Sequence, residues 1–251
     1  MVVRKLSEVF LAKGADVRLF RMEKSEPARV ERSHIIGLAF PVAVQSTYPL
    51  VWKFIEKLPP APATGIFMVD TLAGFSGGVV GPLRKILSGK GYRPLGAAEI
   101  VMPNNFLPSR IDPEENTKKI AAGLEKAEKF ADSLLDGTSR WGRVPILSDL
   151  ICGISRSGLV KNYLRKKGKR LTVQESVCTR CGICSTLCPV GNIYPGPDKY
   201  PVFSDRCQQC MRCFSFCPTG AITVPGKKYQ VYRAVKAGEI LKEDKENILK
   251  V

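Results

Sequence analysis

The sequence predicts an α/β protein in which an open parallel sheet is followed by a small α+β domain. Strand and helix patterns alternate along residues 1–137, which is typical of an open parallel sheet. One cysteine pattern then occurs twice within residues 171–225, and the shortness of this stretch indicates a small separate domain. Residues 138–170 are expected to form a basic connector between the two, and residues 226–251 a basic C-terminal tail.

The elements of the first part are predicted from the spacing of apolar residues and from the positions of Pro and Gly. Strands are expected at residues 15–20, 34–40, 65–70 and 97–102, and helices at residues 2–13, 49–58 and 82–88. The run at residues 34–40 is continuously apolar, so we expect that strand to be buried on both faces.

Two further helical patterns close the first part and open the connector. Asp112 can cap the first helix, Pro113 suits its first position, and Glu114 and Glu115 lie at its positive end. The second pattern is an amphipathic stripe that we expect to pack on one domain, with Cys152 as a buried structural thiol. The stripe consists of Ile146, Leu147, Leu150, Ile151 and Ile154.

Eight of the nine cysteines form two copies of one pattern. The copies are Cys178-x2-Cys181-x2-Cys184-x3-Cys188-Pro189 and Cys207-x2-Cys210-x2-Cys213-x3-Cys217-Pro218. Three thiolates at two-residue gaps lie on one tight loop and can bind three irons of a cubane, while the fourth cysteine reaches the other cluster in two-cluster proteins. The spacing predicts two [4Fe–4S] clusters. The expected ligands are Cys178, Cys181, Cys184 and Cys217 for the first cluster, and Cys207, Cys210, Cys213 and Cys188 for the second.

Zinc and disulfides are the alternative uses of these cysteines. Structural zinc prefers two separated Cys-x2-Cys pairs, whereas each run here has three cysteines in a row followed by Cys-Pro. Disulfides suit small secreted chains, and we see no signal-peptide pattern in this sequence.

The two copies are 29 residues apart, and the residues that follow each Cys-Pro are also similar. In both, a glycine permits a chain reversal and an isoleucine, Ile193 or Ile222, is expected to begin a strand. Apolar side chains nearby can form a shell that excludes water from the sulfurs. This expected shell consists of Val177, Ile183, Phe203, Met211, Phe214 and Phe216.

The positive charge of the chain is concentrated in its second part. The formal net charge is +16, and residues 141–251 carry 19 basic against 8 acidic residues, a net +11. The densest run, residues 161–170, has six basic residues and no acidic one. It suits a solvated surface, a docking site for an acidic redox partner, or a site for nucleic acid or anionic lipid. Nucleic acid is not expected, because no helix-turn-helix or aromatic-interleaved signature is present. No apolar run is long enough to span a membrane, and we expect a cytoplasmic protein.

Short motifs throughout residues 1–225 are similar to those of a known family. They are Ile36-Gly-Leu-Ala-Phe-Pro41, Phe54-Ile-Glu-Lys-Leu-Pro59, the loop from Thr71 to Gly78, Gly91-Tyr92, Met102-Pro103-Asn104-Asn105 and the stretch from Asp205 to Cys213. The chain resembles fusions of a flavodoxin-like half to a two-cluster bacterial-type ferredoxin. The resemblance implies a flavodoxin-like sheet of strand order 2-1-3-4-5 that binds FMN at its carboxyl edge. The residues implied to face the isoalloxazine ring are Pro41, Val42, Thr71, Gly74, Gly77 and Gly78.

The sequence departs from this family at its beginning. It starts inside what would be the first helix, so the first strand and the phosphate-binding loop of the family are missing from it. We therefore expect a flavodoxin-like domain that is truncated at its N-terminus. Either the true start lies upstream, or the segments at residues 15–20 and 34–40 pair directly, or the domain is degenerate. The glycines at 74, 77 and 78 equally suit a tight strand-to-helix turn without any flavin.

The sequence therefore predicts an electron-transfer protein that carries two [4Fe–4S] clusters and exchanges electrons with a flavin or an acidic partner. A flavin-dependent reductase, or an electron-entry subunit of a larger redox enzyme, is the alternative. A third hypothesis, an iron–sulfur regulator that binds nucleic acid, would use the basic run at residues 161–170.

Overall fold

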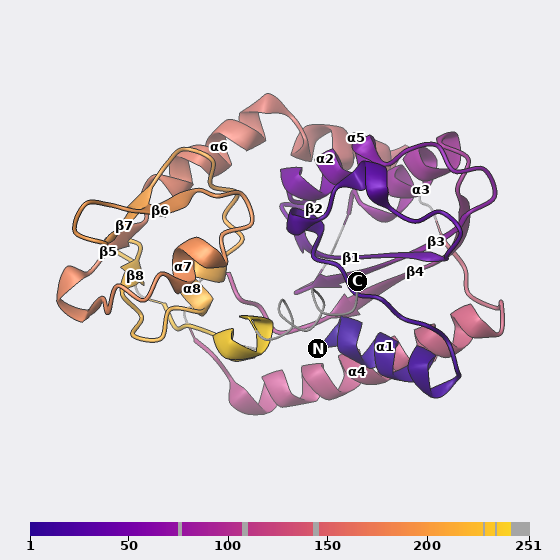
Figure 1. Cartoon of the computed structure of the whole chain (residues 1–251), viewed down its shortest axis with the longest axis horizontal. Coiled ribbons are helices and arrows are strands. Elements are labelled where there is room, and N and C mark those ends of the chain that lie inside the picture. Colours follow the sequence, from indigo (N-terminus) through magenta and orange to yellow (C-terminus); the bar gives the residue numbers. More distant parts are fainter. Residues whose placement is uncertain (75–76, 107–109, 143–145, 228, 234, 242–251) are drawn as a thin grey trace. The chain divides into compact units, whose positions relative to one another are not determined.

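The computed structural model divides into two compact units (Figure 1). The described residues are 1–74, 77–106, 110–142, 146–227, 229–233 and 235–241. The sheet unit consists of residues 1–103 and 113–157, and the cysteine unit of residues 104–112 and 158–251.

The sheet unit is built on a four-stranded sheet with the order β2-β1-β3-β4. Strands β1 (Ile36–Ala43), β3 (Gly65–Leu72) and β4 (Arg93–Val101) are parallel. The short strand β2 (Ser46–Thr47) folds back on the end of β1 as a hairpin. The predicted α/β class and the open, parallel-rich sheet are confirmed.

Helices cover both faces of this sheet, as Figure 1 shows. Helices α1 (Val2–Ala12) and α4 (Pro113–Leu135) pack together on one face. The other face carries α2 (Pro49–Lys57), α3 (Val80–Gly89) and α5 (Leu147–Ser155), together with the 3-10 turns η1 (Met22–Lys24) and η2 (Pro27–Arg29). Each predicted helix of this unit is present within a few residues of its expected bounds.

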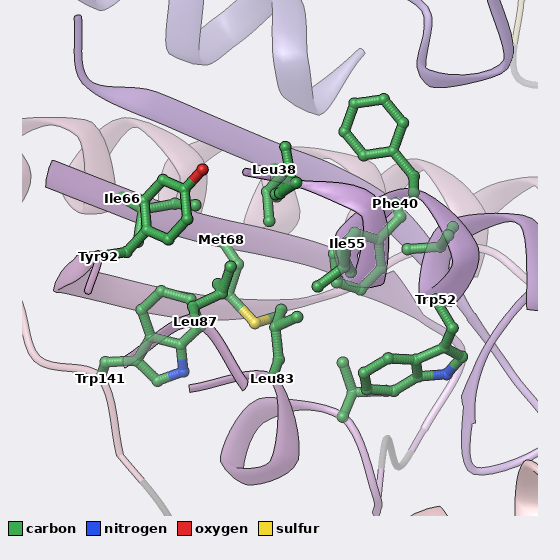
Figure 2. Packing of buried hydrophobic residues seen from close by; sticks show 14 of the residues in the cluster. Leu38, Phe40, Trp52, Ile55, Ile66, Met68, Leu83, Leu87, Tyr92 and Trp141 are labelled. Carbon is green, nitrogen blue, oxygen red and sulfur yellow. The ribbon is translucent and has the colours of Figure 1, made fainter. Parts of the chain in front are cut away.

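Two apolar cores lie on the two faces of the sheet. The larger core joins the sheet to α2 and α3, and Figure 2 shows its packed side chains around Ile55, Met68 and Leu83, all fully buried. Both tryptophans of the chain, Trp52 and Trp141, lie in this core. The smaller core joins β3 and β4 to α1 and α4, and its aromatic rings meet edge to face. These cores hold the carboxyl ends of the parallel strands in fixed positions.

Two predictions for the first strands are wrong. Residues 15–20 form no strand, and they do not pair with β1; among the described residues β1 pairs only with β2 and β3. An extended segment needs a hydrogen-bonding neighbour to become a strand, and none lies beside this one. The prediction that β1 is buried on both faces is also wrong, because Leu38 and Phe40 are buried while Gly37 and Ala39 are exposed. Helices α1 and α4 pack over β3 and β4 and leave this face of β1 uncovered.

The connector is helical, and its apolar stripe faces outward. In α5 the buried residues are Ser148 and Cys152, whereas Leu147, Leu150 and Ile154 are exposed. The prediction that the stripe packs on a domain is therefore wrong, although the burial of Cys152 is confirmed. The helix packs through its small side chains because it lies directly against Gly78. A Cβ added at Gly78 would come within 2.6 Å of the Cys152 backbone nitrogen. Residues 143–145 of the expected connector lie outside the described residues.

The cysteine unit contains short elements joined by tight turns. It begins with α6 (Gly158–Gly168). The other elements are β5 (Thr172–Val173), η3 (Glu175–Val177), α7 (Ile183–Thr186), β6 (Ile193–Pro195), β7 (Pro201–Phe203), α8 (Arg212–Ser215) and β8 (Ile222–Thr223). Strands β5 and β8 form one antiparallel pair, and β6 and β7 form another. Ile193 and Ile222 begin strands, as predicted. Part of the expected tail, residues 228, 234 and 242–251, lies outside the described residues.

Candidate iron–sulfur site

The backbone of the cysteine unit repeats itself with the same 29-residue period as the sequence. Helix α8 corresponds to α7, and β8 begins where the repeat of β6 should begin. Three matched pairs of residues have positive φ angles, between 55° and 71°. The pairs are Arg180 and Gln209, Gly182 and Met211, and Gly191 and Gly220. Residues in this conformation reverse the chain tightly and turn backbone N–H groups toward one side, which suits a loop that wraps an anionic group.

The structure places four cysteines from both repeats around one cavity of about 260 Å³. Cys178, Cys181 and Cys184 come from the first run, and Cys217 comes from the end of the second. Among the described residues, no three Cys, His, Asp or Glu side chains converge closely enough to hold a single metal ion. The four thiols thus surround a volume, and a cluster with several metal atoms fits such a donor set.

The four remaining motif cysteines influence one another electrostatically. Burial, and then the charges of neighbouring thiols including Cys188, raise the pKa of Cys213 and Cys210, and the pKa of Cys210 reaches about 11 although Arg212 opposes this. The pKa of Cys207 is also raised, first by burial and then by the charge of Cys188. Cys188 from the first run therefore lies near the three cysteines of the second. In the first group, burial and then the charges of neighbouring thiols together raise the pKa of Cys184 to about 11, although a hydrogen bond from the Ser185 N–H opposes this. Thiols with such raised pKa values ionise only when a cationic partner binds them.

Backbone N–H groups donate hydrogen bonds to several of the cysteine sulfurs. Asn192 donates to Cys188 Sγ at 3.1 Å, and Ala221, its counterpart in the repeat, donates to Cys217 Sγ at 3.2 Å. Gln209 donates to Cys207 Sγ at 3.3 Å. Such bonds stabilise negatively charged sulfur and tune the potential of a bound cluster. The donor set thus fits iron–sulfur ligation by its chemistry.

The apolar shell differs in part from the predicted one. Met211, Phe214 and Phe203 form a core beside the sulfurs, as expected. Val177 is 43% exposed, so its predicted place in the shell is wrong; it belongs to the turn η3, which directs it outward. The core also includes residues that sequence reasoning missed. These are Leu171 before the first run and Tyr229 after the second. The ring centroids of Tyr229 and Phe214 are 4.7 Å apart.

Asn192 is a buried polar residue whose role sequence reasoning did not detect. Its side chain is almost fully enclosed, at 2% exposure for the residue. The Oδ1 atom accepts hydrogen bonds from the backbone N–H of Arg206 at 2.7 Å and from the Ser204 hydroxyl at 3.1 Å. The side chain therefore fixes the loop that leads into Cys207. The signal available in the sequence was the polar residue at a position where the second repeat has Ala221.

Replacing Asn192 by alanine is expected to loosen this loop, because two donors lose their common acceptor. A lost partner for a buried polar group costs roughly 1–3 kcal/mol. We expect hydrogen–deuterium exchange in the peptide that contains Arg206 to become about tenfold faster or more. Ser204→Ala serves as the control, since it leaves the bond from the Arg206 N–H intact. Equal exchange rates in Asn192→Ala and Ser204→Ala would contradict the assignment.

Helix α6 lies against the second group of cysteines. A Cβ added at Gly168 would come within 2.7 Å of Cys207 Sγ and would meet Cys207 Cβ more closely still. The Gln209 side chain donates a hydrogen bond to the backbone oxygen of Leu164 at 3.1 Å. Arg165 pairs with Asp205 and donates from Nε to its backbone oxygen at 3.1 Å. The sequence predicted a basic connector here, and this contact with the cysteines was not expected.

The residues implied to contact a flavin lie together at the carboxyl ends of β1 and β3. Pro41 and Thr71 are partners in the register of these strands, and Val42 follows Pro41 at the hairpin. The three glycines, Gly74, Gly77 and Gly78, lie between β3 and α3. Gly78 is required by its close packing on α5, and Gly77 has a φ of +64°. Phe75 and Ser76 of the same loop lie outside the described residues.

Asp70 is a second functional candidate that the sequence did not reveal. It is the residue before Thr71 and is completely buried, and neither of its carboxyl oxygens has a hydrogen-bond partner among the described residues. Burial and then the charge of Glu99, its cross-strand neighbour, raise its pKa to about 8, although Lys126 opposes this. Its carboxyl group is therefore neutral at neutral pH.

Comparison with known proteins identifies one domain of the chain. Residues 177–222, which contain all eight motif cysteines, match the family model of the 4Fe-4S dicluster domain. A search of curated proteins found no match. Among solved structures, the chain is similar to rubredoxin oxygen:oxidoreductase from the anaerobe Desulfovibrio gigas, with 16% identity over 55% of this chain and a TM-score of 0.36. The aligned part spans 33% of that protein, and a likeness this distant informs neither function nor cofactor. No helix among the described residues combines the length and apolarity needed to cross a membrane. Residues 177–222 are a 4Fe-4S dicluster ferredoxin domain, which supports a role in electron transfer.

Proposed function

We propose that the protein transfers electrons through two [4Fe–4S] clusters, each bound by three cysteines of one run and the fourth of the other. Cys178, Cys181, Cys184 and Cys217 would hold the first cluster. Cys207, Cys210, Cys213 and Cys188 would hold the second. The observation that carries this proposal is the cavity in which Cys217 joins the three cysteines of the other run.

A bound [4Fe–4S] cluster supplies one-electron redox chemistry. The residues of this chain provide the environment in which that chemistry runs. The N–H groups of Asn192, Gln209 and Ala221 stabilise thiolate charge, and the core around Met211 and Phe214 keeps water from the sulfurs. Electron transfer requires no proton donor and no nucleophile, so the protein needs no further catalytic side chain at this site.

Replacing Cys184 by serine is expected to remove or convert the first cluster, because a thiol that lines the cavity is exchanged for a hydroxyl group, which is a poorer ligand for iron. Anaerobically isolated protein should contain about eight iron and eight sulfide per chain, and Cys184→Ser should lose up to about half of both. Cys152→Ser, at a buried thiol in the sheet unit, is the matched control and should leave both contents unchanged. A colourless protein that contains zinc, or an iron content unaffected by Cys184→Ser, would refute the proposal.

A second candidate function is electron exchange with FMN bound at the carboxyl edge of the sheet. The convergence of Pro41, Val42 and Thr71 with the glycine loop favours it, since open parallel sheets bind ligands at this edge. In that case the protein would be a flavin-dependent reductase or an electron-entry subunit. Titration of the anaerobic protein with FMN tests this, because binding should quench flavin fluorescence and Thr71→Val should weaken the quenching. Absence of quenching at micromolar protein would leave only the role of an iron–sulfur carrier.

We further propose that the redox partner presents an acidic surface and that exchange takes place in the cytoplasm. The charge of residues 141–251, 19 basic against 8 acidic, supports an acidic partner. Thiol ligands that must remain reduced until iron binds them suit a reducing compartment.

A further inference from the structure

Helix α6 presents an exposed surface that combines apolar and basic side chains. Leu159 is 83% exposed and Tyr163 is 56% exposed, one turn apart on the helix. Basic residues crowd the end of the helix and the turn after it, where Lys166, Lys169 and Arg170 are exposed. No Asp or Glu occurs between residues 158 and 174. Exposed apolar residues surrounded by charges of one sign are typical of a surface that binds a partner of opposite charge.

The inner face of the same helix is fixed against the second cysteine group. Leu164 and Gly168 are buried there, and Gly168 leaves no room for a side chain beside Cys207. Gln209, within the Cys207-to-Cys213 loop, donates a hydrogen bond to the backbone of Leu164. An α-helix with its side chains is roughly 10–12 Å across, so a partner seated on α6 would be about one helix diameter from these sulfurs.

Two interactions engage other basic side chains of this helix, Arg165 and Lys167. Arg165 is paired with Asp205, which ties α6 to the loop before Cys207. Lys167 lies over the Tyr163 ring, with its Nζ 5.4 Å from the ring centroid, which holds that ring in place beside the charged residues. Lys166 and Lys169 are both exposed, and they are among the charges that an acidic partner would meet.

We propose that the outer face of α6 is the docking surface for an acidic electron-transfer protein, which exchanges electrons with the cluster held beside Cys207. This inference rests on the proposed function. One electron passes between the reduced cluster and the oxidised partner, a flavoprotein or another iron–sulfur protein, and no bond forms or breaks in this chain. A protein partner fits better than a membrane, because α6 has 11 residues and exposes two large apolar side chains, too little for an interfacial lipid helix.

The test compares charge reversal on α6 with the same reversal elsewhere. Lys166→Glu/Lys169→Glu changes the docking surface, and Lys118→Glu/Lys227→Glu makes an equal change at two exposed lysines that are not part of this helix. Each protein, reconstituted anaerobically and reduced, is mixed with an oxidised acidic flavodoxin in a stopped-flow instrument at low salt. Formation of the flavin semiquinone, which takes up one electron and one proton from water, gives the second-order rate constant.

We expect the α6 variant to react about tenfold more slowly or worse, and to lose most of the salt dependence of the rate, whereas the control variant should change by less than about twofold. Equal effects of the two variants, or no effect of either, would overturn the proposal. It would also be overturned if the α6 variant lost binding to anionic phosphatidylglycerol vesicles or to duplex DNA while its reaction with flavodoxin was unchanged. Iron and sulfide analysis precedes the kinetics, so a failure of the cluster proposal itself would be recognised separately.

Discussion

Replacing Gly168 by alanine is expected to deprive the protein of the cluster held beside Cys207. The added methyl group would lie within 2.7 Å of Cys207 Sγ and even closer to its Cβ. A cysteine bound to iron cannot rotate away, so either the helix or the sulfur must move. Overpacking of this kind typically costs about 1–3 kcal/mol even where the neighbours can relax. Iron content should fall from about eight toward about four per chain.

The control for this experiment lies in the same helix. A Cβ at Gly158 would meet nothing within 4 Å, so Gly158→Ala should keep all of its iron. Alanine has a higher helix propensity than glycine by about 1 kcal/mol. A loss of iron in Gly168→Ala could therefore not be attributed to a destabilised helix. If Gly168→Ala retained its full iron content and visible spectrum, the contact between α6 and Cys207 would not hold in solution.

Replacing Asp70 by asparagine is expected to stabilise the sheet unit at and above neutral pH. The carboxyl of Asp70 has a pKa of about 8 in the folded protein, raised from 3.8 chiefly by burial and then by Glu99. Between these values the unfolded chain releases a proton that the folded chain retains. The contribution of Asp70 to the free energy of unfolding should therefore be greatest below pH 4, fall as pH rises toward 8, and level off above it, at a rate of up to about 1.4 kcal/mol per pH unit. Asparagine cannot ionise, so the variant should lack this fall in stability, with an advantage over wild type on the order of 3–5 kcal/mol at pH 8.

Urea unfolding between pH 5 and pH 9 measures this effect. Trp52 and Trp141 are the two tryptophans of the chain and both lie in the larger core, so their fluorescence reports on the sheet unit alone. Asp132→Asn, at an exposed position on α4, is the matched control and should follow the wild-type profile. Parallel profiles for wild type and Asp70→Asn would show that the carboxyl is solvated or has a partner in solution.

The sequence predicted those features that depend on local patterns. Strands β1, β3 and β4 follow from apolar runs bounded by turn residues, and α4 follows from the cap at Asp112 and Pro113. The cysteine spacing predicted that Cys217 would join the first run, and it lines the cavity with Cys178. The assignment of ligands stays a prediction until iron is measured. Each of these patterns extends over only a few residues or is repeated in the sequence.

The features that the sequence did not reveal depend on neighbours distant in the chain. Residues 15–20 have a strand pattern, yet they pair with no strand among the residues that the structure describes. The stripe on α5 predicted burial, but the contact with Gly78 placed Cys152 inside and Leu150 outside. Asp70 continues an ordinary strand, and only the packing of both faces shows that its carboxyl has no hydrogen-bond partner in the described part of the chain. Tertiary contacts outweighed local pattern in all three cases.

Met211 has a φ of +60° at the position where the other half of the repeat has Gly182. A methionine left to itself avoids this conformation at a cost of about 1–2 kcal/mol, which a cluster bound by the neighbouring cysteines would offset. A newly made chain that has not yet received iron has little reason to adopt this geometry. The tryptophan-containing half, with its own apolar interior, can acquire its structure first, and maturation of the other half then awaits the arrival of metal and sulfide.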